Sequence, residues 1–76
     1  MSLRYALPQA AEAHLTVYDV EGRVVRVLER SALPAGDYSA HWDGRDAAGR
    51  DASTGMYLIR LDVPGRELMQ KIMLLR

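Results

Sequence analysis

The stretch MYLIRLDV, residues 56–63, carries the clearest structural signal in this 76-residue sequence. Successive side chains of a β-strand point to opposite faces, so apolar residues two positions apart indicate a strand with one buried face. The spacing here predicts such a strand. Its apolar face consists of Tyr57, Ile59, Leu61 and Val63, whereas Arg60 and Asp62 belong to the other face.

The same spacing recurs along most of the chain, and turn-forming residues separate the apolar stretches. Pro64-Gly65 predicts a turn, and residues 66–75 form a last strand whose lack of clean alternation predicts that both of its faces are covered. The other expected strands are an edge strand at 3–7 that ends before Pro8, a hairpin of 12–20 and 23–28 around Glu21-Gly22, and a strand at 38–43 after a turn at 32–36.

Trp42, the only tryptophan, shares a strand face with Tyr38 and Ala40, and we expect it at the centre of the core. Residues 44–51 contain many turn formers and predict the longest irregular connection. A brief seventh strand would form if residues 51–53 pair. We therefore expect an all-β fold, a small immunoglobulin-like (fibronectin III-like) β-sandwich of six to seven antiparallel strands.

Length and composition predict one domain over residues 1–76, without a repeat or a linker. The absence of cysteine excludes disulfides and thiol catalysis. Ten basic residues balance ten acidic ones without a basic stripe, so we expect no nucleic-acid partner. No apolar run approaches the roughly 20 residues of a membrane-spanning helix, so we expect no membrane insertion.

Catalysis by acid and base requires two titratable groups within hydrogen-bond reach of each other. The two histidines, His14 and His41, lie on strand faces opposite the inferred core residues and are expected to face solvent. If their strands were neighbours, the imidazoles would approach one another and bind a metal weakly, but a plain surface role is favoured. We expect no enzyme and no cofactor.

Asp43, Asp46 and Asp51 fall within nine positions, interleaved with glycines, and form a weak candidate for a calcium site. Their spacing misses the EF-hand pattern, and Arg45 and Arg50 place positive charge where a cation would sit. The favoured alternative is that these aspartates accept hydrogen bonds from loop amides and pair with those arginines. Under that interpretation the loop holds no metal.

Five motifs, taken in order, resemble the immunoglobulin-like domain of the flagellar hook-capping protein family. They are similarly close to the C-terminal sorting domains of type IX secretion substrates. The resemblance runs from about Tyr5 to Arg76 and implies a non-catalytic sandwich appended to larger proteins. The motifs are LTVYDVEGRVV (15–25), LPAGDY (33–38), WDGRD (42–46) with Gly49-Arg50, STGMY (53–57) and KIMLLR (71–76).

Because the chain ends directly after its last strand, as sorting domains do, the favoured function is a C-terminal sorting or anchoring module of a secreted or cell-surface bacterial protein. The alternative is a structural assembly module, as in flagellar hook-cap or adhesin scaffolds, with weak self-association. A third hypothesis is a calcium-dependent or carbohydrate-binding module. The expected partners are proteins, either secretion machinery or neighbouring domains of a larger parent protein, and the expected location is extracellular or the cell surface, reached through the periplasm. The resemblance implies partner binding by Lys71, Ile72, Met73, Leu74, Leu75 and Arg76.

Overall fold

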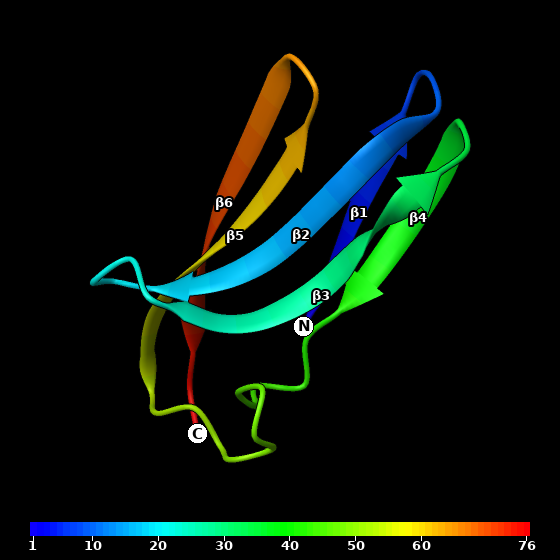
Figure 1. Ribbon diagram of the computed structural model, residues 1–76. Coiled ribbons are helices and arrows are strands. Elements are labelled where there is room, and N and C mark those ends of the chain that lie inside the picture. The colour runs from blue at the N-terminus through cyan, green and yellow to red at the C-terminus, as the bar shows by residue number, and fades with distance from the viewer.

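The computed structural model describes residues 1–76 and consists of β-strands, turns and loops, without a helix (Figure 1). It accordingly contains no helix long and apolar enough to cross a membrane. Every strand pair is antiparallel. The strands are β1 (Ser2–Leu7), β2 (Ala11–Asp19), β3 (Val24–Leu33), β4 (Gly36–His41), β5 (Gly55–Val63) and β6 (Arg66–Leu74).

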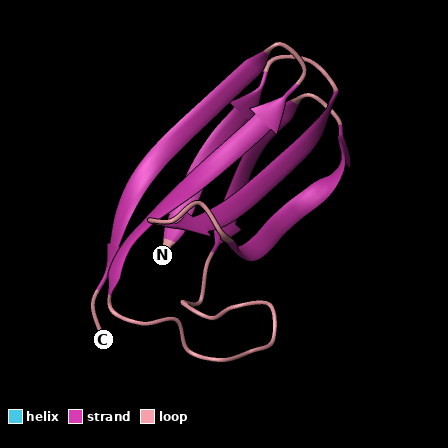
Figure 2. Ribbon diagram, turned by 60° about the vertical axis from the view of Figure 1, so that its left-hand side comes forward, coloured by secondary structure: helices cyan, strands magenta, loops and turns pink.

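The strands form two sheets that lie face to face (Figures 1 and 2). The larger sheet has the order β3-β2-β5-β6, and the smaller one consists of β1 and β4. This arrangement confirms the expected all-β immunoglobulin-like sandwich, with six strands. The short seventh strand is reduced to an isolated bridge between Arg45 and Asp51.

The core lies between the two sheets, and Trp42 is at its centre, as predicted. Its side chain directly follows β4, is 1% exposed, and packs edge-on against Tyr57 with ring centroids 5.1 Å apart. The indole Nε1 donates a hydrogen bond to the Arg45 carbonyl at 2.9 Å, so the ring also fixes the start of the long loop. The buried apolar residues are Leu7, Ala13, Leu15, Val17, Trp42, Tyr57, Ile59 and Leu61.

The expectation that both faces of the last strand are covered is wrong. β6 is an edge strand that pairs only with β5, and Met69 and Met73 are 62% and 52% exposed. The smaller sheet contributes two strands to the sandwich, so it covers the inner face of the larger sheet and leaves the other face open. The mixed apolar pattern of β6 therefore reflects an exposed edge strand.

The β2–β3 hairpin is longer than predicted, because β3 continues beyond residue 28 to Leu33 and leaves only Pro34-Ala35 as the next turn. Its register with β2 shifts between Leu15 and Thr16 and again between Val17 and Tyr18. Such bulges add a residue to one strand and break the spacing of two. This is why the sequence pattern of β3 does not alternate cleanly.

Replacing Trp42 by alanine should remove a large share of the domain's free energy of unfolding. Removing a buried aromatic side chain costs about 3–5 kcal/mol, against a total stability of about 4–11 kcal/mol for a chain of this size. Val20→Ala is the control, since Val20 is 73% exposed. Chemical denaturation followed by far-UV circular dichroism measures the difference, and a Trp42→Ala variant as stable as Val20→Ala would show that the indole is not central.

Candidate functional site

Two turns of the same design lie at one end of the sandwich, in the sequences DVEGR (19–23) and DAAGR (46–50) (Figure 1). In both, the aspartate N–H donates to the carbonyl of the arginine four residues later, at 3.0 and 2.9 Å. The glycine N–H donates back to the aspartate carbonyl at 3.0 Å in each turn. Both glycines adopt a left-handed conformation, with φ of 82° and 83°, which strains other residues.

The aspartate side chains complete these turns. In each, one carboxylate oxygen accepts hydrogen bonds from the backbone N–H groups two and four residues later, all at 2.9–3.0 Å. The other oxygen accepts from the arginine Nε, at 2.9 Å for Arg23 and 3.2 Å for Arg50. These bonds hold the pKa of Asp19 and of Asp46 below the usual value of an aspartate, and the bond from the arginine backbone N–H has the largest effect.

The pattern D-x-x-G-R occurs three times in the sequence, and two of its copies, at 19–23 and 46–50, form turns with the same hydrogen bonds. The third copy, DVPGR at 62–66, instead forms the two-residue Pro64-Gly65 turn between β5 and β6. The aspartate is needed to accept from two amides, and the glycine is needed for its positive φ. The five residues therefore permit this turn, and the surrounding chain decides whether it forms.

The three aspartates proposed as a weak calcium site do not converge on a common centre. Asp43 accepts a hydrogen bond from the Arg45 N–H at 3.0 Å, and Asp46 closes the turn described above. Asp51 pairs with Arg45 and Arg76, each at 3.6 Å. No group of three or more carboxylates and histidines is placed to hold a metal ion. These aspartates instead accept hydrogen bonds from loop amides and pair with arginines, as the favoured alternative predicted.

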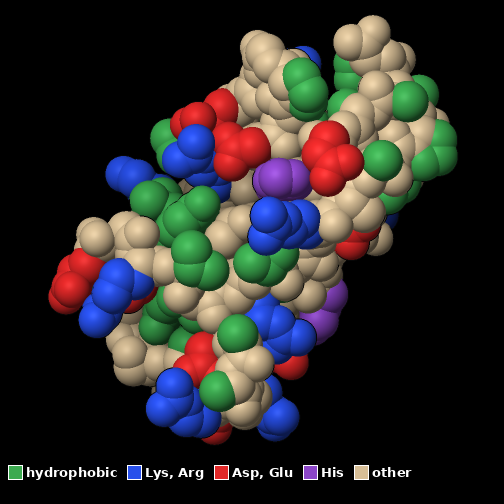
Figure 3. All heavy atoms as spheres, in the orientation of Figure 1, with side chains coloured by type: hydrophobic (Ala, Val, Ile, Leu, Met, Phe, Trp, Pro, Cys, Tyr) green, Lys and Arg blue, Asp and Glu red, His purple; other side chains and the backbone are tan.

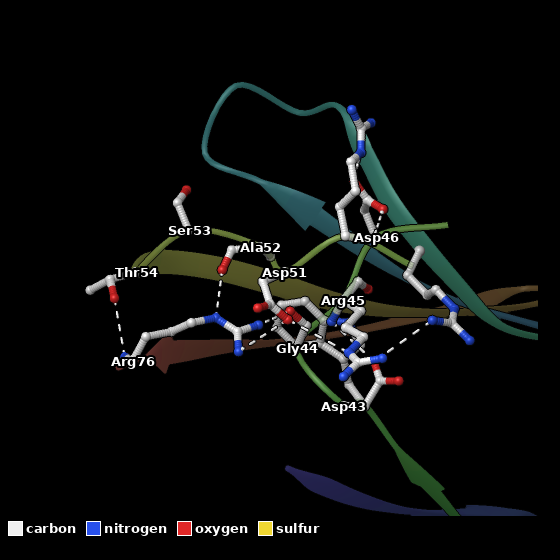
Figure 4. A network of polar contacts seen from close by, with 12 residues as sticks. Asp43, Gly44, Arg45, Asp46, Asp51, Ala52, Ser53, Thr54 and Arg76 are labelled. Carbon is white, nitrogen blue, oxygen red and sulfur yellow. Dashed lines mark hydrogen bonds and ion pairs between the residues drawn. The ribbon is translucent and has the colours of Figure 1, made fainter. Parts of the chain in front are cut away.

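Arg76 ties the end of the chain to this loop (Figure 4). Its Nε donates to the Ala52 carbonyl at 2.8 Å, and its backbone N–H donates to Thr54 Oγ1 at 3.1 Å. The guanidinium also donates to the carbonyl of Gly44. Gly44 has a φ of 76°, in the left-handed region that favours glycine, and this backbone turns its carbonyl to the guanidinium. The loop and Arg76, two residues after the end of β6, thus form one unit, hereafter the Arg76 clamp.

The other residues assigned to partner binding divide between two environments. Ile72 and Leu74 are partly buried and pack against the core, whereas Met73 and Leu75 are exposed. Lys71 lies on the outer side of the sheet, opposite Leu58 of β5. Their role in partner binding stays a prediction, and the exposed members are the ones available to a partner.

The histidines do not meet. His14 lies on β2 of the larger sheet, with its Nε2 3.4 Å from a carboxylate oxygen of Glu12. His41 lies on β4 of the smaller sheet, with its Nδ1 3.3 Å from the hydroxyl of Ser2. A shared metal site or an acid–base pair between the two imidazoles is therefore not formed.

A groove of about 650 Å³ lies between the turns at 19–23 and 46–50, and residues 51–57 also line it. Its rims carry the exposed side chains of Arg23 and Arg50, and no histidine or cysteine lines it. The Asp19 and Asp46 carboxylates in its walls are held by their own turns. The two other carboxylates of its lining, Glu21 and Asp51, form ion pairs with arginines, so the groove offers a polar surface.

The outer face of the larger sheet, on the side away from β1 and β4, carries exposed apolar side chains. The strand registers place Tyr18 beside Leu58 and Val24, and Met56 beside Met73. Figure 3 looks onto this face and shows apolar side chains gathered over the middle of the sheet, with charged side chains on either side. The exposed apolar members are Val24, Val27, Met56, Met69 and Met73.

Comparison with known proteins gives two results. The profile of the family described as "FlgD Ig-like domain" matches residues 1–64. The proteins named "Basal-body rod modification protein FlgD" from Salmonella typhimurium and Salmonella typhi are each 41% identical to this chain over 46 residues. That alignment covers 60% of this chain and 20% of each relative, so the match spans about a fifth of the relatives' length.

Removing the Arg76 clamp should loosen the loop without unfolding the sheets. Arg76→Ala loses the bonds to Ala52 and Gly44, which should cost about 1 kcal/mol. Because local opening exposes the loop, trypsin should cleave after Arg45 and Arg50 faster than in the unmodified chain. Mass spectrometry of limited digests measures the rates. Arg66→Ala, which removes an exposed arginine, is the control, and equal cleavage in both variants would argue against the clamp.

Acid should weaken the domain through Asp19 and Asp46. Folding lowers the pKa of both carboxyl groups. Such a group stabilises the folded state at pH values above its pKa in the unfolded chain, which is about 4. This stabilisation is lost as the pH falls through the pKa of the folded state. At pH values lower than about 4, the melting temperature of the domain should therefore decrease. An Asp19→Asn, Asp46→Asn double variant should melt lower at pH 7 and change less on acidification. Asp37→Asn is the control, and parallel pH profiles for all three proteins would contradict this origin.

Proposed function

Because the chain belongs to the FlgD Ig-like domain family, we propose that it is a non-catalytic structural module that takes part in protein assembly, as in a flagellar hook cap or an adhesin scaffold. The relatives from Salmonella are named as proteins that modify the basal-body rod. The match spans a fifth of their length, and the role carried over to this chain is that of a sandwich that contacts other proteins.

The observation that carries this proposal is the apolar outer face of the larger sheet. Exposed apolar side chains that gather in one place on a small protein mark a surface for another protein. Here Val24, Met56 and Met73 are exposed beside Tyr18 and Leu58. Charged side chains border them, which is the usual arrangement of a protein interface with a polar rim.

The placement of the titratable groups supports a role without catalysis. The Asp19 and Asp46 carboxylates accept hydrogen bonds within their own turns, and Asp51 pairs with two arginines. The two histidines lie on different sheets. The chemistry-bearing side chains of this chain thus serve its local structure, which is what a binding module requires.

A C-terminal sorting or anchoring role, which the sequence analysis favoured, gains no support from the comparisons. The family match ends at residue 64, before β6, the strand on which that interpretation depended most. We therefore prefer the assembly role. For its place of action we propose the extracellular side or the surface of a bacterium, reached through the periplasm.

Charge placed on the outer face should weaken binding to an assembly partner. We expect the chain to bind at least one hook or rod subunit encoded in the same genome, measured by biolayer interferometry. Val24→Asp and Met56→Asp should each weaken binding about fivefold or more, the effect of losing a moderately important interface residue. Val20→Asp alters an exposed residue at the hairpin tip and should bind normally.

Failure of the unmodified chain to bind any of these subunits would contradict the assembly role. Export of a reporter fused to this chain by a type IX system would instead support sorting. Unchanged binding by both outer-face variants would show that the partner contacts a different surface.

A further inference from the structure

The larger sheet has two free edges, and only one of them has bulges and a covering loop. Along β3, the two bulges disturb the edge, and the Ala47 N–H of the long loop already donates to the Val25 carbonyl at 3.0 Å. Natural proteins use bulges and covering loops to prevent further strands from pairing. β6, in contrast, pairs with β5 over nine residues without a shift in register, and no other strand borders it.

The hairpin register shows which backbone groups of β6 are free. Val63 and Arg66 form the pair that closes the two-residue Pro64-Gly65 turn, and such closing pairs exchange hydrogen bonds. Hydrogen-bonded pairs alternate along an antiparallel ladder. The N–H and C=O groups that point away from β5 are therefore those of Glu67, Met69, Lys71 and Met73.

The side chains along this open edge have a symmetric pattern of charge. Glu67 and Lys71 lie two residues to either side of Met69, with opposite charges. All three side chains lie on the outer face of the larger sheet, because they share one strand face with the exposed Met73. When two antiparallel copies pair with Met69 at the centre, Glu67 of each copy lies opposite Lys71 of the other.

We propose that a second copy of this chain pairs with β6 in this antiparallel register, so that the larger sheets of both copies form one continuous sheet. The arrangement has two-fold symmetry, and every contact occurs twice. Three residue pairs exchange about six backbone hydrogen bonds. The proposal rests on the strand geometry and stands independently of the hook-cap role.

Charge selects this register over its neighbours. A register centred on Lys71 would place two ammonium groups opposite each other, which is destabilising. A register centred on Gln70 would place Glu67 opposite Met73 and form no ion pair. Within the chain, Arg60 Nη2 already lies 2.9 Å from a carboxylate oxygen of Glu67. The lysine of the second copy would extend that pair into a chain of alternating charges across the two-fold axis.

Cysteine crosslinking tests the central contact, because the chain has no cysteine of its own. In the proposed dimer the two residues at position 69 have Cα atoms about 5.5 Å apart, within the reach of a disulfide. Met69→Cys should therefore form a disulfide-linked dimer under mild oxidation, seen on a non-reducing denaturing gel. Met73→Cys is the matched control, since the two residues at position 73 would be about 27 Å apart along the strand, and it should form no disulfide.

Charge reversal tests the register by a second route. Lys71→Glu replaces two attractive pairs by two repulsive ones, and it should raise the dissociation constant in sedimentation equilibrium about tenfold. Glu67→Lys should do the same. Mixing the two variants should restore association, since a mixed dimer has opposite charges at both pairs. Thermal melts of each variant confirm that the monomer is folded.

Three results would overturn the proposal. One is a chain that stays monomeric at the highest soluble concentration, which would leave the edge of β6 to a strand of a different protein. Another is a disulfide that forms as readily in Met73→Cys as in Met69→Cys. The third is a dimer whose dissociation constant does not change in Lys71→Glu, while the melts show folded protein.

Discussion

The contact between the Trp42 indole and Tyr57 is the interaction on which the rest of this structure depends. Trp42 follows a strand of the smaller sheet, and Tyr57 belongs to the larger one, so the 5.1 Å approach of their rings joins the two layers. Each ring also fixes the loop between them. The indole donates to the Arg45 carbonyl, and the Tyr57 hydroxyl donates to the Ser53 carbonyl at 2.7 Å. With eight buried apolar residues in the core, the domain has no second cluster to replace this one.

The strand at Tyr57, Ile59 and Leu61 and the central position of Trp42 were predictable, because one buried face imposes a spacing of two on the sequence. β3 was predicted too short, since bulges remove that spacing, and β6 was placed in the interior because apolar content does not distinguish an edge strand from a covered one. The pairing of β1 with β4 follows from contacts distant in sequence, which periodicity does not encode. The turns at 19–23 and 46–50 are held by bonds to their own aspartates, but the same D-x-x-G-R pattern at 62–66 forms a two-residue hairpin turn, so the pattern alone does not predict the turn.

Charge in this protein is used mainly within the chain. Asp19 and Asp46 complete their turns, Arg76 binds two loop carbonyls, and Asp51 pairs with arginine. The candidate site that the aspartates indicated is thus part of the architecture. The outer face of the larger sheet and the open edge of β6 take no part in these bonds, and both are suited to contact with protein.

The Arg76 clamp has a consequence for the order in which the domain matures. A ribosome releases the chain from its N-terminus, and small domains fold as units once enough of the chain has emerged. All residues of the β2–β3 hairpin emerge early from the ribosome. The loop at 44–54 can bind Arg76 only after residue 76 has emerged. A chain truncated within β6 would therefore keep that loop unfastened and open to proteases and chaperones.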